Sequence, residues 1–189
     1  MNDRRPTLLE YALLGLANNQ PRTGYAFRKV FEATPMAHYS SSPGSIYPAL
    51  QRLDERGLLE SSVGDGDTLR PKRVYTVTSE GVEALRAWVS QRVTREDVIW
   101  RPRELMLRFS FMGGLVDDDV SCTFLEQLAV ELDGYARSLE EYRSAMPGHG
   151  PPHGVLAMEA GLANVRSMKT WAKNALRQFL PSQRSDGRG

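Results

Sequence analysis

The sequence predicts a mainly α-helical protein with one small β-hairpin. Apolar residues recur at helical spacing in segments spread over most of the 189 residues, and a pair of strand-like segments flanks a turn-rich stretch. The composition is that of a folded protein, because 41% of the residues are hydrophobic and 25% are charged. We therefore expect one large domain or two small ones, built mostly from helices.

The first half of the chain carries the clearest signals for secondary structure. Thr23 is a suitable N-cap for a second helix, and Gly57 is a suitable C-cap for a third. The predicted elements are, in order, helices at 7–17, 23–33 and 42–57, strands at 58–63 and 73–78, and a helix that begins at Ser79. Three helices, a hairpin and a further helix are the order of a winged helix-turn-helix.

The third predicted helix contains a proline, Pro48, although a proline in a helix interior costs about 3 kcal/mol. If the helix begins at Ser42, Pro43 takes the favoured first position, and if it begins at Ser45, Pro48 falls in the first turn. Steps of 100° per residue place the apolar side chains on one face. These inward residues are Ile46, Ala49, Leu50 and Leu53.

The opposite face of this helix suits the major groove of DNA. Its N-terminal half is small, uncharged and able to hydrogen-bond, and a helix N-terminus attracts phosphate. The other interpretation is a solvated face with an awkwardly placed proline. The predicted DNA contacts on this helix are Gly44, Ser45, Tyr47, Gln51 and Arg52.

Basic residues gather where the second strand leaves the turn of the hairpin. Arg70, Lys72 and Arg73 could clamp phosphates beside the helix, or could merely keep a charged loop in solution. Asp65 and Asp67 lie nearer the tip and repel phosphate, so we expect the base of this wing to touch DNA. The formal net charge of +1 favours neither interpretation.

The second half of the chain predicts a helical domain. Residues 94–103, TREDVIWRPR, have the character of a polar connector. Helices are expected at 103–112, 117–142 and 155–180. The predicted organisation is a DNA-binding domain at 1–92, a helical dimerisation and effector domain at 93–181 and a disordered tail at 182–189.

Three motifs resemble those of the PadR family of bacterial transcriptional regulators. They are an LLGL start followed by Gly24-Tyr25, the stretch SPGSIYPALQRLDERGLLE, and RVYTVTSEG in the second strand. The resemblance covers roughly residues 8–90, and the later stretches RPRELMLRFSFMGGL and EAGLANVRSMKTWAKNAL match the family's helical C-terminal domain more loosely. Ser45-Ile46 replaces the commoner Thr-Leu, and the wing tip GDGD is longer and more acidic than usual.

The resemblance implies a homodimeric repressor that binds a palindromic operator in double-stranded DNA. It implies that Tyr47 and the basic wing contact DNA and that the C-terminal helices form the dimer. The residues expected in that interface, or equally in an ordinary intrachain core, are Leu162, Val165, Trp171, Ala172, Leu176 and Phe179.

A small apolar or aromatic effector is a further expectation. Pliable methionine and tryptophan side chains suit a sensor pocket near the domain junction, although they also fill ordinary cores. The predicted lining is Trp100, Met106, Met158 and Trp171.

Catalytic chemistry is not expected. His149 and His153 are separated by two prolines and lack an acidic neighbour, and Cys122 lies without a histidine beside it. We therefore expect no enzyme activity, metal or cofactor, and a cytoplasmic protein without a membrane span. The alternative function is a winged protein-interaction module that binds no operator.

Overall fold

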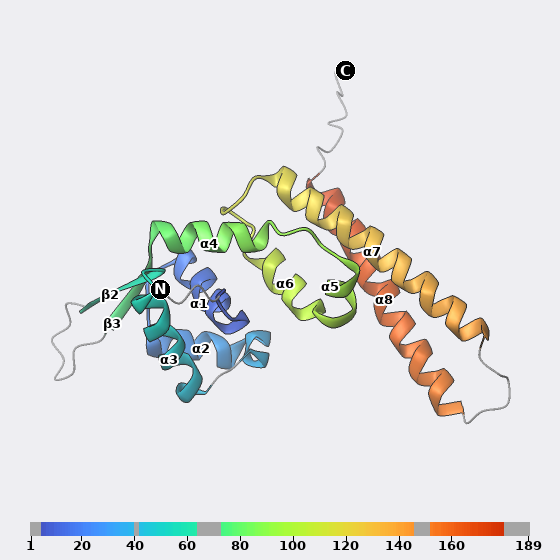
Figure 1. The fold of residues 1–189 in the computed structure, drawn as a ribbon, viewed down its shortest axis with the longest axis horizontal. Coiled ribbons are helices and arrows are strands. Elements are labelled where there is room, and N and C mark those ends of the chain that lie inside the picture. Colours follow the sequence, from blue (N-terminus) through green and yellow to red (C-terminus); the bar gives the residue numbers. More distant parts are fainter. Residues whose placement is uncertain (1–4, 40–41, 64–72, 146–151, 180–189) are drawn as a thin grey trace, which may run out of the picture. The chain divides into compact units, whose positions relative to one another are not determined.

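The computed structural model describes residues 5–39, 42–63, 73–145 and 152–179, and divides the chain into two compact units (Figure 1). The first unit is Met1–Val89 and the second is Ser90–Gly189. Mostly helical units with one small sheet confirm the predicted fold class. The predicted tail, 182–189, lies outside the described residues.

The first unit is a winged helix-turn-helix. Its antiparallel sheet has the strand order β1-β3-β2, in which Ser61 and Arg22 both lie opposite Tyr75. The two-residue strand β1 was missed by the sequence prediction because it is too short to show alternation. The elements are α1 (Leu8–Asn19), β1 (Arg22–Thr23), α2 (Gly24–Ala33), η1 (Pro35–His38), α3 (Pro43–Glu55), β2 (Leu59–Val63), β3 (Arg73–Val77) and α4 (Ser79–Val89).

Local capping signals set the ends of these helices. The Thr23 hydroxyl accepts a hydrogen bond from the backbone N–H of Ala26 at 3.2 Å, which confirms the predicted cap of α2. Helix α3 begins at Pro43, so Pro48 lies inside the helix and removes one backbone hydrogen bond. At its other end Gly57 has φ of +69°, and its N–H donates to the carbonyl of Asp54 at 2.9 Å.

The core of the first unit is formed around α1, which is buried along most of its length. The ring of Tyr11 in α1 stacks on Trp88 in α4 with centroids 4.3 Å apart. Completely buried side chains from α2, α3 and α4 fill the rest of the core. They are Phe27, Phe31, Ile46, Ala49, Leu50, Leu53 and Leu85.

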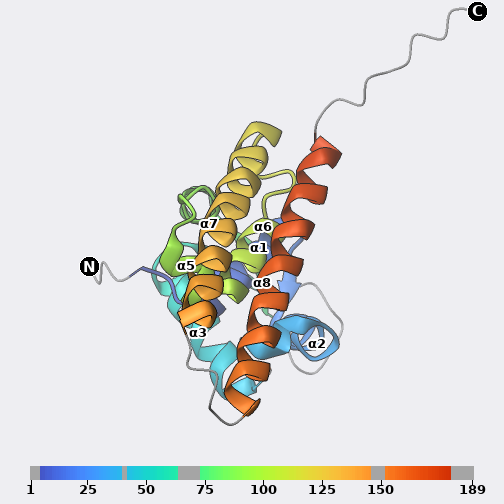
Figure 2. The same cartoon turned by 90° about the vertical axis from the view of Figure 1, so that its right-hand side faces the viewer.

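In its described residues the second unit has four helices, α5 (Arg95–Trp100), α6 (Pro102–Ser110), α7 (Asp118–Ala145) and α8 (Pro152–Phe179). The predicted polar connector at 94–103 is wrong, because α5 occupies most of it. Thr94 and Asp97 form a capping box, and Val98 is buried. Helices α7 and α8 lie side by side as a long antiparallel pair (Figure 2). Among the described residues, the helices are either too short or too polar to cross a bilayer.

Candidate nucleic-acid interface

Helix α3 separates its apolar and polar residues as the sequence predicted. Ile46, Ala49, Leu50 and Leu53 are completely buried. On the opposite side Gly44, Pro48 and Gln51 are exposed, Ser45 is half-buried, and Tyr47 keeps 45% of its surface accessible to solvent. A helix with this arrangement presents its N-terminal half to a partner while its other side holds the core together.

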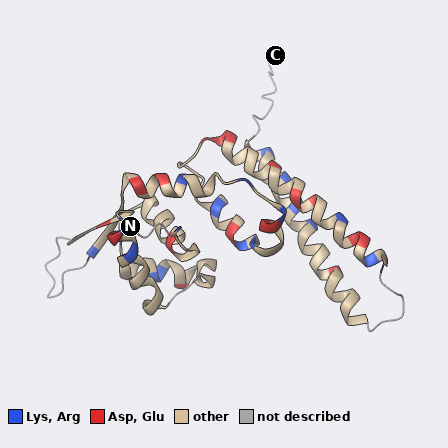
Figure 3. Cartoon of the chain, in the orientation of Figure 1, with Lys and Arg blue, Asp and Glu red and all other residues tan. Residues whose placement is uncertain are grey.

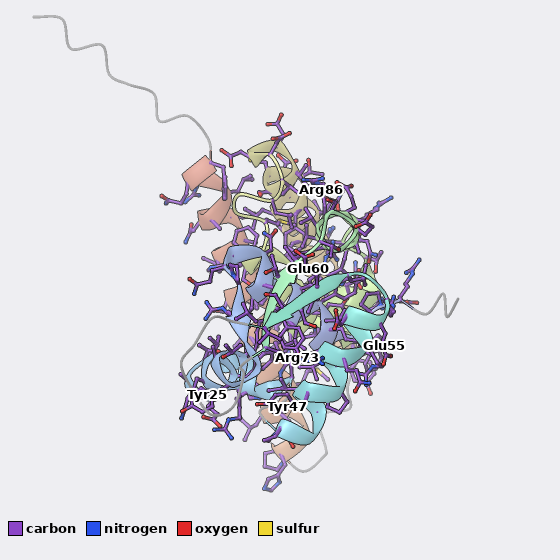
Figure 4. All side chains as sticks on the ribbon, turned by 90° about the vertical axis from the view of Figure 1, so that its left-hand side faces the viewer. Tyr25, Tyr47, Glu55, Glu60, Arg73 and Arg86 are labelled. Atoms are coloured by element: carbon purple, nitrogen blue, oxygen red, sulfur yellow. The ribbon has the colours of Figure 1, made fainter. Side chains whose placement is uncertain are left out.

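Tyr47 is held in place by a close approach to Gly24, the first residue of α2. A Cβ atom on Gly24 would lie 2.4 Å from Cε1 of the tyrosine ring, which is far inside van der Waals contact. The ring therefore rests on the start of α2, and Figure 4 shows Tyr47, Tyr25 and Arg73 on one face of the first unit. The absence of a side chain at residue 24 thus fixes the orientation of the exposed tyrosine.

A cavity of about 570 Å³ lies between α2, α3 and β3. Three tyrosine rings supply apolar walls and hydroxyl groups, and the first turn of α2 and the guanidinium of Arg73 supply positive potential. Its lining residues are Thr23, Gly24, Tyr25, Tyr47, Arg73 and Tyr75. Sequence reasoning missed Thr23, Gly24, Tyr25 and Tyr75, because these residues meet Tyr47 only through the packing of α2 and β3 against α3.

Tyr75 keeps its phenol protonated at neutral pH. Burial raises the pKa of Tyr75 above its ordinary value of 10.0, and the positive charge of Arg73 opposes this effect. A protonated hydroxyl can donate a hydrogen bond, so Tyr75 and Arg73 together present donors toward the cavity. Such a set of donors suits an anionic group such as a phosphodiester.

The wing is attached to α3 by a side-chain hydrogen bond. The hydroxyl of Ser61 in β2 donates to Oδ2 of Asp54 in α3 at 2.8 Å. Arg73 begins β3 opposite Val63, is exposed, and lines the cavity beside Tyr47. The other two predicted wing contacts, Arg70 and Lys72, lie outside the described residues, as does the GDGD tip.

The C-terminal half of α3 is less suited to DNA than its N-terminal half. Glu55 is exposed there, as is Glu60 at the start of β2, and the amide of Gln51 donates to the carboxylate of Glu55 at 2.8 Å. Arg52, which was predicted to contact DNA, donates from Nε to Oε1 of Glu10 at 2.7 Å, and half of its side chain is exposed. The structure therefore concentrates the candidate interface on residues 44–51 and the start of β3.

The predicted effector residues lie on α5, α6 and α8 of the second unit. Met106 and Met168 line a cavity of about 10 Å³, which is too small for an effector. Trp100 is 78% exposed, and the ring of Trp171 packs edge-on against Phe109. Met158 is half-buried on α8.

The predicted interface residues on α8 fall into two groups. Leu162 and Ala172 are buried within a single chain, so they belong to its core. Trp171 is 36% exposed, while Val165, Leu176 and Phe179 are half-buried. Two exposed residues at the start of α8, Val155 and Leu156, were missed, although their run of small and apolar neighbours in the sequence could have indicated them.

The described residues contain no cluster of three metal-binding side chains. His38 and His153 are exposed, and His149 lies outside the described part of the chain. Burial, followed by the charge of Asp119, raises the pKa of the half-buried Cys122 thiol, which disfavours the reactive thiolate.

Residues 13–87 match the model of the transcriptional regulator PadR-like family, a segment that runs from α1 to α4 and contains Tyr47 and Arg73. This segment is similar to the PadR-like family, as the motifs in the sequence predicted. The members of that family are transcriptional regulators.

Matches to individual PadR proteins extend over nearly the full length of this chain. It is 24% identical over 176 residues to the negative transcriptional regulator PadR of Bacillus subtilis (strain 168), which covers 89% of this chain and 96% of that protein. The crystal structure of Bacillus subtilis PadR in complex with operator DNA matches at 20% identity, 92% and 99% coverage of the two chains and a TM-score of 0.44. The PadR-like regulator BC1756 from Bacillus cereus matches at 22% identity, 90% and 97% coverage and a TM-score of 0.39.

Proposed function

We propose that this PadR-like regulator is a homodimeric repressor that recognises a palindromic operator through the N-terminal half of α3. The observation that carries the proposal is the exposed Tyr47, seated on Gly24 beside Arg73 and above a completely buried apolar face. Small residues at the start of α3 permit close approach to base edges, and the neighbouring donors suit the phosphate backbone.

The predicted contacts other than Arg52 each have a distinct role in this proposal. Gly44 and Ser45 let the helix approach the groove, while the Gln51 amide reads a base edge after releasing Glu55. Tyr47 and Arg73 hold the sugar-phosphate backbone at the rim of the cavity. Arg70 and Lys72 extend this contact along the wing.

An exposed apolar surface on α8 supports the dimer. Val155 and Leu156 are exposed, and between His153 and Val165 the helix carries a single charged residue, Glu159 (Figure 3). Apolar surface of this kind is stabilised by a second copy of the chain. Two winged units related by a two-fold axis read half-sites about one helical turn, ~34 Å, apart.

The sign of regulation and the effector complete the proposal. The Bacillus subtilis relative is named a negative regulator, which supports repression here. A small apolar or aromatic effector would release the operator by shifting the equilibrium between two dimer geometries by about 1–3 kcal/mol. The protein acts without enzymatic chemistry and without a cofactor in this proposal, and it functions in the cytoplasm, where its DNA target lies.

A winged protein-interaction module remains the competing function. The composition of the outward face of α3 argues against it, because that face carries polar and small residues with one tyrosine instead of an apolar patch. The salt dependence of binding distinguishes the two functions. DNA binding releases counterions, so its affinity falls steeply as salt is added.

The proposed function is tested by selecting the genomic fragments that the full chain binds, followed by gel-shift titrations on the recovered operator. We expect Tyr47→Ala and Arg73→Gln each to weaken operator binding by about tenfold or more. Arg86→Gln is the matched control, because Arg86 is an exposed arginine on α4 (Figure 4) and its replacement removes the same charge. Failure to recover any fragment, or unchanged affinity in both interface variants with circular dichroism intact, would refute the proposal.

A further inference from the structure

A buried carboxylate joins the first helix to the end of the recognition helix. Glu10 in α1 is 3% exposed, and both of its oxygen atoms have partners. Oε1 accepts from Nε of Arg52 at 2.7 Å, and Oε2 accepts from the backbone N–H of Thr7 at 2.8 Å. Nη1 of Arg56 lies 3.8 Å from Oε2.

Arg52 lies in the last turn of α3 and Arg56 is the C-cap that follows it, four residues later. Glu10 therefore holds the last turns of α3 against the first turn of α1, while the apolar residues of α3 pack over the rest of its length. A carboxylate this deeply buried requires compensating positive charge, so Arg52 and Arg56 cannot leave it without cost.

We propose that Glu10 is a positioning residue for operator binding, which sets the direction of α3 and withholds Arg52 from the DNA phosphates. This inference rests on the proposed function, because it concerns the same α3 surface. The side chain of Arg52 is half exposed. Its positive charge is nevertheless neutralised by the ion pair with the buried carboxylate of Glu10. The specific contacts therefore come from residues 44–51 and Arg73, and Arg52 serves the geometry of the helix.

Loss of the carboxylate has a predictable effect on selectivity. Without Glu10, two guanidinium groups at the C-terminal end of α3 become free to attract any phosphate, whatever the base sequence. At the same time the helix loses the ion pair that fixes its end. Binding to the operator weakens while binding to unrelated DNA stays equal or strengthens, so the ratio of the two affinities falls.

The first experiment measures how operator affinity depends on salt in the wild type, Arg52→Gln and Arg73→Gln. Each phosphate contact contributes a slope of about −0.9 to the plot of log affinity against log salt. We expect Arg73→Gln to make the slope shallower by about 0.9 and Arg52→Gln to leave it unchanged, even where its affinity falls. A slope for Arg52→Gln as shallow as that for Arg73→Gln overturns the inference, because Arg52 then binds phosphate directly.

The second experiment compares Glu10→Gln with Glu83→Gln, which removes the same charge from an exposed position on α4. The probes are the recovered operator and a duplex of unrelated sequence. We expect Glu10→Gln to lower the ratio of the two affinities by about tenfold, equivalent to about 1.4 kcal/mol, and Glu83→Gln to leave it unchanged. An unchanged ratio in Glu10→Gln, with a normal circular dichroism spectrum, overturns the positioning role.

If Glu10→Gln fails to fold, the slope of Arg52→Gln decides the inference alone. The failure of the proposed function has a different signature. In that case the wild type shows no operator binding or no salt dependence. Failure of the inference leaves wild-type binding and its salt dependence intact.

Discussion

Tyr47 owes its position to a residue that has no side chain. The sequence predicted that Tyr47 points away from the core, because helical spacing fixes which residues share a face. Its contact with Gly24 could not be predicted, since it depends on how α2 packs against α3. The same limit applies to Glu10 and Arg52, which are 42 residues apart. Local patterns reveal the direction of a side chain, whereas its distant partners depend on tertiary packing.

A methyl group at residue 24 should displace the tyrosine. We expect Gly24→Ala to weaken operator binding by about tenfold, because the ring must leave the start of α2 to avoid a 2.4 Å contact. Gel-shift titration measures the change. Gly113→Ala is the control, because a Cβ there meets nothing within 4 Å. Equal affinity of the two variants would show that the close contact does not orient Tyr47.

The buried phenol of Tyr75 predicts sensitivity to alkaline pH. Because its pKa is raised in the folded protein, Tyr75 contributes stability that is complete below the unfolded pKa of about 10 and is lost as pH rises through the folded pKa. Urea unfolding at a series of pH values should show the wild type losing more stability above this point than Tyr75→Phe. Parallel pH profiles for the two proteins would contradict the raised pKa.

At the scale of elements, helix bounds were predicted well where the capping residues at the helix ends were clear in the sequence. The third helix was expected between Ser42 and Gly57, and α3 occupies Pro43–Glu55 with Gly57 just beyond it. Helix α5 was missed because its capping box, Thr94 and Asp97, lies in a charged stretch with few apolar residues. The apolar period was too short there to outweigh the polar composition.

The glycine after α3 should be difficult to replace. Its φ of +69° is strained for a residue with a side chain, so we expect Gly57→Ala to lower the free energy of unfolding by about 1 kcal/mol or more. Urea denaturation gives the measurement. Ala87→Gly, at an exposed position within α4, is a useful comparison because its cost arises from helix propensity alone. A Gly57→Ala variant as stable as the wild type would mean that the helix end adapts freely.

At the scale of the whole molecule, the sequence distributed the proposed dimer surface differently along α8 than the structure suggests. It selected residues from Leu162 onward, of which Leu162 and Ala172 belong to the core of a single chain. The exposed apolar residues begin earlier, at Val155 and Leu156. Helical spacing cannot separate a face that packs on the same chain from one that packs on a second chain, because both are apolar.

A charge placed at the start of α8 should separate the dimer. We expect Leu156→Glu to shift the protein toward the monomer in sedimentation velocity runs at a series of concentrations, because a carboxylate is costly to bury in an apolar interface. Operator affinity should fall with it. Ser138→Glu introduces the same charge at an exposed position on α7 and should leave the dimer intact. A dimer unaffected by Leu156→Glu would place the contact between subunits elsewhere.

The carboxylates near the C-terminal end of α3 bear on how the proposed regulator would search a genome. With Glu55 and Glu60 exposed and an overall charge of only +1, the protein has little general attraction to the polyanion. We expect it to spend most of its search unbound, reaching sites by diffusion through solution with little sliding along the duplex. Few molecules would then be bound to unrelated chromosomal DNA. The fraction of promoters occupied would therefore depend closely on the number of regulator molecules in the cell.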